Sequence, residues 1–281
     1  MTGHDETTTR LRAERRGAVL LLTLDGPRSR NAVGPDIYPQ VQAHLISAAT
    51  DPGLRAVILT GAGGFFSSGG HVRALQDSAQ GTLAAATTNT DKLNAMIKAI
   101  VDCPLPVIAA VEGGAAGAAL GMVLACDLIV AARDAKFTVA HVRVGLSPDG
   151  GVTHFLAAAM PRQAVMAMCL LGEPVGAADL AQAGIVTTLA APGTALDTAL
   201  ALAHRLADGP PCAIGRIKHL VTTGRQAALA THLDAEAQAL NRARFGREAA
   251  EGLAAFREKR RPDFNAGCDP APTPVAGRAL C

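Results

Sequence analysis

The sequence is poor in aromatic residues and in net charge. Aromatic residues make up 3% of the 281 positions, tryptophan is absent, and Tyr38 is the single tyrosine. Proteins that stack nucleic-acid bases use exposed aromatic rings, and proteins that bind a phosphate backbone need a basic face. The 26 basic and 24 acidic residues leave a formal charge of only +2. The composition therefore argues against a dedicated nucleic-acid-binding protein.

The sequence also lacks a clear membrane span and a secretory leader. The longest apolar stretch, 115–132, is interrupted by Gly117, Gly121 and Asp127, and it falls short of the ~20 apolar residues that cross a bilayer. The first 17 residues are polar and contain no apolar segment of the kind that a signal peptide needs. We therefore expect a cytoplasmic protein with no membrane partner.

The common cofactor and metal motifs are missing as well. There is no GxxxxGK[ST] phosphate loop, no HExxH zinc motif, no GxSxG nucleophile turn and no CxxC pair among the six cysteines. The glycine-rich segment 61–66 ends in Phe66, where a dinucleotide-binding GxGxxG motif requires a third glycine. We expect neither a metal nor a separate cofactor.

Short apolar runs alternate with helical patterns through the first part of the chain. Strands are expected at 18–24, 55–60, 106–111, 127–132 and 136–139, and helices at 36–49, 89–101 and 116–125. This alternation is typical of an α/β protein whose sheet is covered by helices. After about residue 150 helical patterns dominate.

The change of pattern suggests a division of the chain. We expect an α/β core over 15–195 and a helical C-terminal region over 196–264. The polar segment 1–14 is expected to be a flexible arm. The segment 265–281, rich in proline, alanine and glycine, is expected to be a disordered tail.

Two glycine-rich turns follow apolar strands, at 67–70 and 113–119. Such turns can point main-chain N–H groups at an oxygen that gains negative charge, because small residues let a ligand approach closely. A helix that begins at such a turn adds the positive end of its dipole. The alternative is that both segments are tight turns that serve packing alone.

Five segments resemble, in the same order, the crotonase superfamily, which is the enoyl-CoA hydratase/isomerase family. They are Asn31-Ala32, RAVILTGAGGFFSSGG at 55–70, PVIAAVEGGAAGAALGMVLACDLIVAA at 106–132, GLSPDGGVTHFL at 145–156 and FREKRRPDF at 256–264. The resemblance implies an α/β fold in which a spiral of β-β-α units is followed by a helical region that forms a homotrimer or a dimer of trimers. It also implies an enzyme acting on an acyl-CoA, as in fatty-acid metabolism, with coenzyme A as part of the substrate.

The resemblance assigns two backbone donors to an oxyanion hole. One is the N–H of Gly70, and the other is the N–H of Ala118 in the small-residue triplet 117–119. Alanine keeps its N–H group, so a triplet that differs from the frequent Gly-Gly-Gly serves equally well. The two donors would bind the thioester oxygen and stabilise its enolate.

The acid–base residues depart from those of the family's hydratases. Hydratases carry two glutamates, at the positions that are Gly121 and His141 in this chain. Asp149, in the turn 147–151, matches the catalytic aspartate of isomerase-like branches, which include Δ3,Δ2-enoyl-CoA isomerases and a ring-opening epoxide isomerase. The alternative roles are a helix N-cap for Asp149 and a pocket-lining side chain for His141.

The resemblance further implies residues that contact CoA or the substrate, since the phosphates of CoA attract cations. These residues are Arg28, Arg30, Ala32, His71, Val72, Arg73, Phe256 and Lys259. For the charged members, a solvated surface position is the alternative.

Three functions remain open at this point. The first is an enoyl-CoA isomerase in which Asp149 moves a proton from the alpha to the gamma carbon. The second is an enoyl-CoA hydratase in which His141 or Asp149 acts on water. The third, motivated by the loss of both glutamates, is a CoA-binding protein without catalysis.

Overall fold

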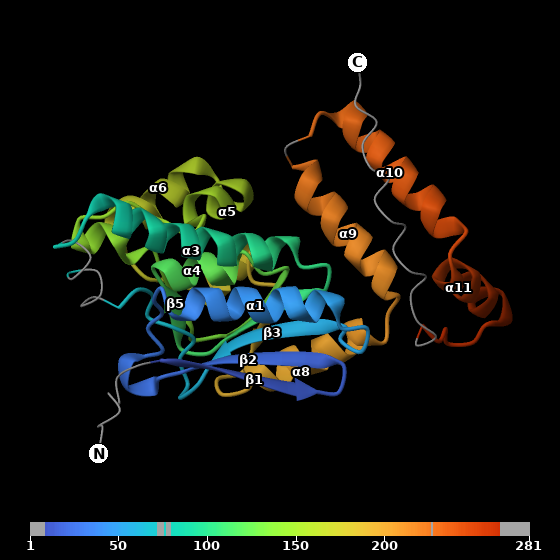
Figure 1. Ribbon diagram of the computed structural model, residues 1–281, viewed down its shortest axis with the longest axis horizontal. Helices are drawn as coiled ribbons and strands as arrows, with labels where there is room; N and C mark the ends of the chain where they lie inside the picture. Colours follow the sequence, from blue (N-terminus) through green and yellow to red (C-terminus); the bar gives the residue numbers. More distant parts are fainter. Residues whose placement is uncertain (1–8, 72–75, 77–79, 226, 265–281) are drawn as a thin grey trace. The chain divides into compact units, whose positions relative to one another are not determined.

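The computed structural model describes residues 9–71, 76, 80–225 and 227–264 (Figure 1). The chain divides into two units, Met1–Ala207 and Asp208–Cys281. In these described ranges, no helix combines the length and the apolar character that a membrane crossing requires.

The first unit is built on a six-stranded sheet. Its order is β1 (Arg10–Arg16), β2 (Val19–Asp25), β3 (Ala56–Gly61), β4 (Val107–Val111), β6 (Leu128–Ala132) and β9 (Thr188–Ala190). β1 runs antiparallel to β2, and all the other neighbours pair in parallel. The strands from β2 to β6 are almost continuous apolar runs, as expected of parallel strands that are covered on both faces.

Helices cover the two faces of this sheet (Figure 1). One face carries α1 (Ile37–Thr50), α3 (Leu83–Asp102) and α4 (Ala118–Leu124), and the other carries α8 (Ala195–Ala207). The buried alanines of α8 recur every four residues, at Ala195, Ala199 and Ala203, which lets the helix lie close to the strands. α8 therefore belongs to the sheet unit, although the sequence placed residues 196–207 in the C-terminal region.

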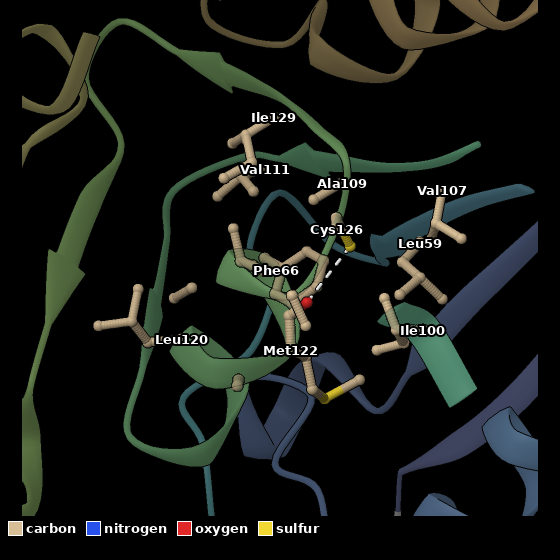
Figure 2. Packing of buried hydrophobic residues seen from close by; sticks show 14 of the residues in the cluster. Leu59, Phe66, Ile100, Val107, Ala109, Val111, Leu120, Met122, Cys126 and Ile129 are labelled. Atoms are coloured by element: carbon tan, nitrogen blue, oxygen red, sulfur yellow. Dashed lines mark hydrogen bonds between the residues drawn. The ribbon is translucent and has the colours of Figure 1, made fainter. Parts of the chain in front are cut away.

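The larger core lies between the sheet and the first three of these helices. Figure 2 shows a part of it, in which Leu59, Val107, Ala109, Val111 and Ile129 of the sheet pack with Phe66, Ile100, Leu120, Met122 and Cys126. The Cys126 thiol donates a hydrogen bond to the carbonyl oxygen of Met122 at 3.2 Å. Because Phe66 is fully buried, the loop after β3 is anchored in the core just before it reaches the first glycine-rich turn.

A smaller three-stranded sheet holds the second glycine-rich turn. β5 (Gly114–Ala116) pairs in parallel with β7 (Lys136–Thr138), which pairs antiparallel with β8 (Val175–Gly176). The bounds of five further helices of this unit are η1 (Pro27–Ser29), η2 (Ala140–Val144), α5 (Val152–Ala159), α6 (Arg162–Leu171) and α7 (Ala177–Gln182).

The second unit contains α9 (Pro211–Gly224), α10 (Leu229–Arg244) and α11 (Arg247–Glu258). The carboxylate of Glu248 accepts hydrogen bonds from the backbone N–H groups of Cys212 and Ala213, at 2.7 and 2.9 Å. These bonds join the beginning of α11 to the beginning of α9, where the N–H groups have no partner inside their own helix.

The N-terminal segment differs from the prediction. The sequence suggested a flexible arm over 1–14, but Arg10–Arg16 forms β1, in register with β2 from Arg10 opposite Asp25 to Arg16 opposite Val19. The strand lies at the edge of the sheet, and most of its side chains are exposed. Charged residues are common on edge strands, so the strand carries no apolar alternation that would have revealed it.

Candidate active site

The two glycine-rich turns lie against each other. The backbone N–H of Ser67 donates to the carbonyl oxygen of Gly114 at 3.3 Å, and the N–H of Ala116 donates to the carbonyl oxygen of Ser67 at 3.1 Å. Gly69 has a φ of +91°, and a Cβ at this position would clash with the carbonyl oxygen of Ala116. Glycine at position 69 thus permits both the left-handed backbone and the close approach of the two turns.

Each of these turns presents an unused backbone donor, the N–H of Gly70 and the N–H of Ala118. Gly70 pairs with Val33 in an isolated bridge, whose hydrogen bonds run from Val33 N–H to Gly69 O (2.8 Å) and from His71 N–H to Val33 O (3.3 Å). Ala118 is the first residue of α4, where an N–H has no partner inside the helix. Neither N–H makes a hydrogen bond within the part of the chain that is described. Two free donors on touching turns are the arrangement of an oxyanion hole.

The side chain of Asn31 ties together the loops that support the first turn. Its Oδ1 accepts from the N–H of Gly26 at 2.8 Å, and its Nδ2 donates to the carbonyl oxygens of Ala62 and Phe65 at 2.8 and 2.6 Å. Asn31 is fully buried, with a φ of +54°. The neighbouring Arg30 places its guanidinium 5.6 Å from the centre of the Phe65 ring. The loop after β2 and the loop after β3 are therefore held as one piece.

His141 and Asp149 form a hydrogen-bonded pair, with His141 Nε2 3.0 Å from Asp149 Oδ1. His141 lies in η2 and is 8% exposed, whereas 41% of the Asp149 side chain is exposed. His141 Nδ1 is enclosed and has no partner among the described residues. An ionised carboxylate can only accept, so a hydrogen bond from His141 to an ionised Asp149 places a proton on Nε2. Asp149 Oδ2 makes no hydrogen bond to any described residue and can meet a substrate.

The His141–Asp149 pair lies beside the second glycine-rich turn. A Cβ on Gly117 would be 4.0 Å from His141 Nε2, and a Cβ on Gly150 would be 3.6 Å from the carbonyl oxygen of Ala118. The His141–Asp149 pair and the N–H of Ala118 are therefore neighbours. In such an arrangement, an N–H group can bind a carbonyl oxygen while a carboxylate transfers protons to or from the adjacent carbon atoms.

Gly121, which the sequence resemblance matched to a hydratase glutamate, leaves no room for a side chain. A Cβ there would clash with the carbonyl oxygen of Gly150, which is a backbone atom of the Asp149 turn. A carboxylate at position 121 would therefore require this turn to move.

The N-cap alternative for Asp149 is not what the structure shows. The N-cap of α5 is Gly151, and this helix start has no side-chain capping hydrogen bond. The exposed carboxylate of Asp149 is bound to His141 instead. In the described residues, no three or more His, Cys, Asp or Glu side chains come together in a way that could hold a metal ion.

The other residues proposed from the sequence are spread over both units. Arg28 and Arg30 are exposed in and after η1, and Ala32 is half-buried. Val72 and Arg73 lie outside the described residues. Phe256, on α11, is 83% exposed and Lys259 is the C-cap of that helix, both in the second unit. Their contacts with CoA stay predictions.

Tyr38 belongs to the surroundings of the site, and the sequence analysis missed it. It is the second residue of α1 and is 6% exposed. Burial raises the pKa of its phenol well above the ordinary value, and the negative charges of Asp149 and Asp36 raise it further. The available signal was its place on the apolar stripe of the helix with Val41 and Leu45.

The model of one protein family, described as enoyl-CoA hydratase/isomerase, matches residues 14–267. This range contains both glycine-rich turns and the pair His141–Asp149. The chain belongs to the enoyl-CoA hydratase/isomerase family. Acyl-CoA substrates are implied by this membership.

Relatives within the enoyl-CoA hydratase/isomerase family carry both kinds of name. The 2,3-dehydroadipyl-CoA hydratase of Escherichia coli (strain K12) is 34% identical over 251 residues, which are 89% of this chain and 96% of that protein. The 1,2-epoxyphenylacetyl-CoA isomerase of the same strain is 32% identical over 247 residues, 88% of this chain and 94% of that protein.

The same family provides solved structures of the same fold. The crystal structure of an enoyl-CoA hydratase from Polaromonas sp. JS666 matches with a TM-score of 0.89 at 37% identity, and covers 90% of this chain and 98% of that one. The fold is therefore the crotonase fold, and the protein is an enzyme of the hydratase or isomerase type.

Proposed function

We propose that this enzyme is an enoyl-CoA isomerase in which Asp149 is the only acid–base carboxylate. The observation that carries the proposal is the contact between Gly121 and the carbonyl oxygen of Gly150, which leaves no space for the first hydratase glutamate. His141 occupies the position of the second glutamate and is hydrogen-bonded to Asp149. One carboxylate with one free oxygen suits a proton transfer within a single substrate.

The reaction would begin with a 3-enoyl-CoA whose thioester oxygen accepts from the N–H groups of Gly70 and Ala118. Asp149 Oδ2 removes a proton from C2, and the electrons of that C–H bond form a dienolate that the two donors stabilise. The carboxyl group then returns the proton to C4, a C2–C3 double bond forms, and the thioester carbonyl is restored. The atoms and electrons balance without an oxidant or a separate cofactor. His141 would hold Asp149 Oδ1 and so keep Oδ2 toward the substrate.

A second candidate function is hydration. It is favoured by His141, because this side chain stands in place of a hydratase glutamate and shares a proton with Asp149, and an imidazole–carboxylate pair can act on water. It also agrees with the hydratase names of several relatives. The missing second carboxylate counts against it.

The test is a paired assay of the wild type and Asp149→Asn. Isomerisation of 3-enoyl-CoA to 2-enoyl-CoA and hydration of 2-enoyl-CoA are measured on the same preparations. We expect isomerisation in the wild type and a kcat about 10²- to 10⁴-fold lower in the variant, the usual contribution of a positioned acid–base group. Asp91→Asn, a matched change at an exposed position of α3, should alter kcat less than about twofold.

The other outcomes identify the remaining candidates. Fast hydration with slow isomerisation in the wild type would replace the isomerase by a hydratase. Isomerisation that survives Asp149→Asn would remove Asp149 from the mechanism. Tight binding of acyl-CoA ligands without any turnover would leave a CoA-binding protein.

A further inference from the structure

We propose that Ser67 is a positioning residue for the oxyanion hole. Its hydroxyl accepts a hydrogen bond from the N–H of Gly69 at 3.2 Å, and this bond keeps the neighbouring N–H of Gly70 directed at the thioester oxygen. The inference rests on the proposed function, because it assigns the N–H of Gly70 to an acyl-CoA thioester. It adds a side chain to a site whose two proposed donors are backbone groups.

The first argument is the freedom of the peptide group that carries the first donor. The N–H of Gly70 belongs to the peptide between Gly69 and Gly70. Neither residue has a Cβ, so steric hindrance restricts the rotation of this peptide less than at any other pair of residues. A donor on such a peptide keeps one direction only if hydrogen bonds hold the backbone beside it. A misdirected donor would stabilise the enolate poorly.

Two hydrogen bonds hold this part of the backbone. The N–H of Val33 donates to the carbonyl oxygen of Gly69 at 2.8 Å. The peptide is trans and planar, so its N–H points opposite to its carbonyl group and away from Val33. Ser67 Oγ binds the N–H at the other end of Gly69, whose φ is +91°. The direction of the Gly70 N–H therefore depends on one backbone bond and one side-chain bond.

Ser67 is itself fixed relative to the second glycine-rich turn. It is fully buried, and it forms an isolated bridge with Ala115 of β5. The hydrogen bonds of this bridge join Ser67 to Gly114 and to Ala116, two residues before Ala118. The hydroxyl of Ser67 thus links the first donor to the turn that carries the second, and the spacing of the two donors depends on it.

The second donor is oriented by the backbone of α4. Ala118 is the first residue of this helix, and the carbonyl oxygen of Gly117 accepts from the N–H of Leu120 at 3.0 Å. The peptide between Gly117 and Ala118 is therefore held by the first turn of α4. Removal of the Ser67 hydroxyl should misdirect the Gly70 donor and leave the Ala118 donor in place.

The test compares the wild type with Ser67→Ala, which removes the hydroxyl and nearly keeps the shape. The buried N–H of Gly69 then loses its acceptor, and the backbone beside it can rotate. We expect the kcat of isomerisation to fall about 10- to 100-fold, less than the loss of a whole donor would cost. KM should change less than about threefold, because oxyanion donors bind the enolate more strongly than the ground state.

A spectroscopic measurement separates positioning from a general loss of stability. Hexanoyl-CoA labelled with ¹³C at its carbonyl carbon has no double bond that an isomerase could move. Hydrogen bonds to the carbonyl oxygen shift the ¹³C resonance downfield, because they draw electrons toward that oxygen. We expect a downfield shift when the ligand saturates the wild type, and a smaller shift when it saturates Ser67→Ala.

Thr60→Val is the matched control. It also removes a buried hydroxyl, which donates to the carbonyl oxygen of Ala110 at 3.0 Å between β3 and β4. The variant should destabilise the fold, keep the wild-type ¹³C shift and change kcat less than about twofold.

Ser67→Cys is a second variant, which keeps the test decisive if Ser67→Ala does not fold. It nearly keeps the shape and replaces the oxygen by sulfur, a weak hydrogen-bond acceptor. We expect kcat and the ¹³C shift to fall in the same direction as in Ser67→Ala, by a smaller amount.

Two results would overturn this inference alone. They are a wild-type ¹³C shift that persists in the Ser67 variants, or a loss of the shift in Thr60→Val as large as in Ser67→Ala. A wild type that binds hexanoyl-CoA without a downfield shift would overturn the oxyanion hole, and with it the proposed function and this inference. A shift that depends on Ser67, in a protein that hydrates 2-enoyl-CoA and does not isomerise 3-enoyl-CoA, would overturn the proposed function and support this inference.

Discussion

At the scale of single residues, the candidate site depends on close backbone–backbone contacts at two glycines. Gly69 brings the two glycine-rich turns together, and Gly121 lets the Asp149 turn lie on α4. In both cases a Cβ would clash with a carbonyl oxygen. A carbonyl oxygen in a packed turn cannot move aside as a flexible side chain does. The positions of the donors and of the carboxylate are therefore set by residues that have no side chain.

The consequence can be tested at position 121. Gly121→Ala should lower the free energy of unfolding by about 1–3 kcal/mol, the usual cost of overpacking, and should reduce turnover because the Asp149 turn is displaced. Urea unfolding and the isomerase assay measure the two effects. Gly176→Ala is the matched control in the same unit, because the nearest atoms to its Cβ would belong to the side chains of Asp179 and Lys136 and not to the backbone. Equal effects of the two substitutions would mean that the contact at Gly121 relaxes easily.

At the scale of elements, the loops after β2 and β3 are joined by the amide of Asn31. Three hydrogen bonds of 2.6 to 2.8 Å use its oxygen once and its nitrogen twice. No other side chain of this size supplies one acceptor and two donors in that geometry. The loop that leads to Gly70 therefore depends on one buried amide.

Asn31→Asp tests this dependence with almost no change of shape. A carboxylate would face the carbonyl oxygens of Ala62 and Phe65 without a proton to donate. We expect the free energy of unfolding to fall by about 3 kcal/mol, as for a buried charge that loses its partners. Urea unfolding at neutral pH measures the change. Gln40→Glu, the same chemical change on an exposed side chain of α1, should stay within about 0.5 kcal/mol, and an equally small effect of Asn31→Asp would refute the argument.

The elements also show what the sequence could predict and where it failed. The buried strands β2, β3, β4 and β6 were predicted because continuous apolar runs between turns are a strong local signal. β1 was missed because an edge strand facing solvent has no such run. The unit boundary was placed too early because the small alanines of α8 show their contact with the sheet only in three dimensions.

The sequence predicted one part of the candidate site and missed another part. The motifs identified the two turns, and in the structure these turns meet, while the N–H groups of Gly70 and Ala118 make no hydrogen bond to a described residue. Their role as oxyanion donors stays a prediction. The bond between His141 and Asp149 could not be read from the sequence, because it depends on how η2 and the following turn fold back. Tyr38 was missed for a related reason, since an aromatic residue on an apolar stripe is indistinguishable from ordinary core.

At the scale of the whole molecule, the two units are built differently. The first has a layered core, whereas no residue of α9 or α10 is buried. The second unit exposes large apolar side chains, which include Ile217, Val221, Leu240, Phe245 and Leu253. Apolar surface of this extent is typical of a subunit interface. The trimer or dimer of trimers stays a prediction, and these side chains are its expected contacts.

The second unit should respond to acid through Glu251. Its carboxylate accepts from Arg260 Nη1 at 2.6 Å, from Arg260 Nη2 at 2.9 Å and from the backbone N–H of Asp263 at 2.8 Å. The Arg260 hydrogen bond, followed by that of Asp263, lowers the pKa of Glu251 from 4.5 to about 2. A carboxyl group whose pKa is lower in the folded state stabilises it above the unfolded value, and the effect disappears as the pH falls through the folded value.

The stabilisation by Glu251 should therefore be complete above about pH 5 and lost between pH 4.5 and 2. We expect the difference in thermal midpoint between the wild type and Glu251→Gln to shrink over this interval, because both side chains are then neutral. Circular dichroism at a series of pH values measures it. Asp234→Asn, an exposed carboxylate on α10, should show little difference at any pH, and a gap for Glu251→Gln that stays constant would contradict the assignment.

The contact between Gly121 and the Gly150 carbonyl oxygen also limits which substitutions at position 121 evolution can accept. Glycine and glutamate codons can differ by one base, as GGA and GAA do, so a single mutation is enough to encode a second carboxylate. The glutamate side chain that it encodes would clash with the carbonyl oxygen of Gly150. A lineage that gains a carboxylate at position 121 must first accept substitutions that move the turn 149–151. A laboratory selection for hydration should therefore diversify that turn before it diversifies position 121.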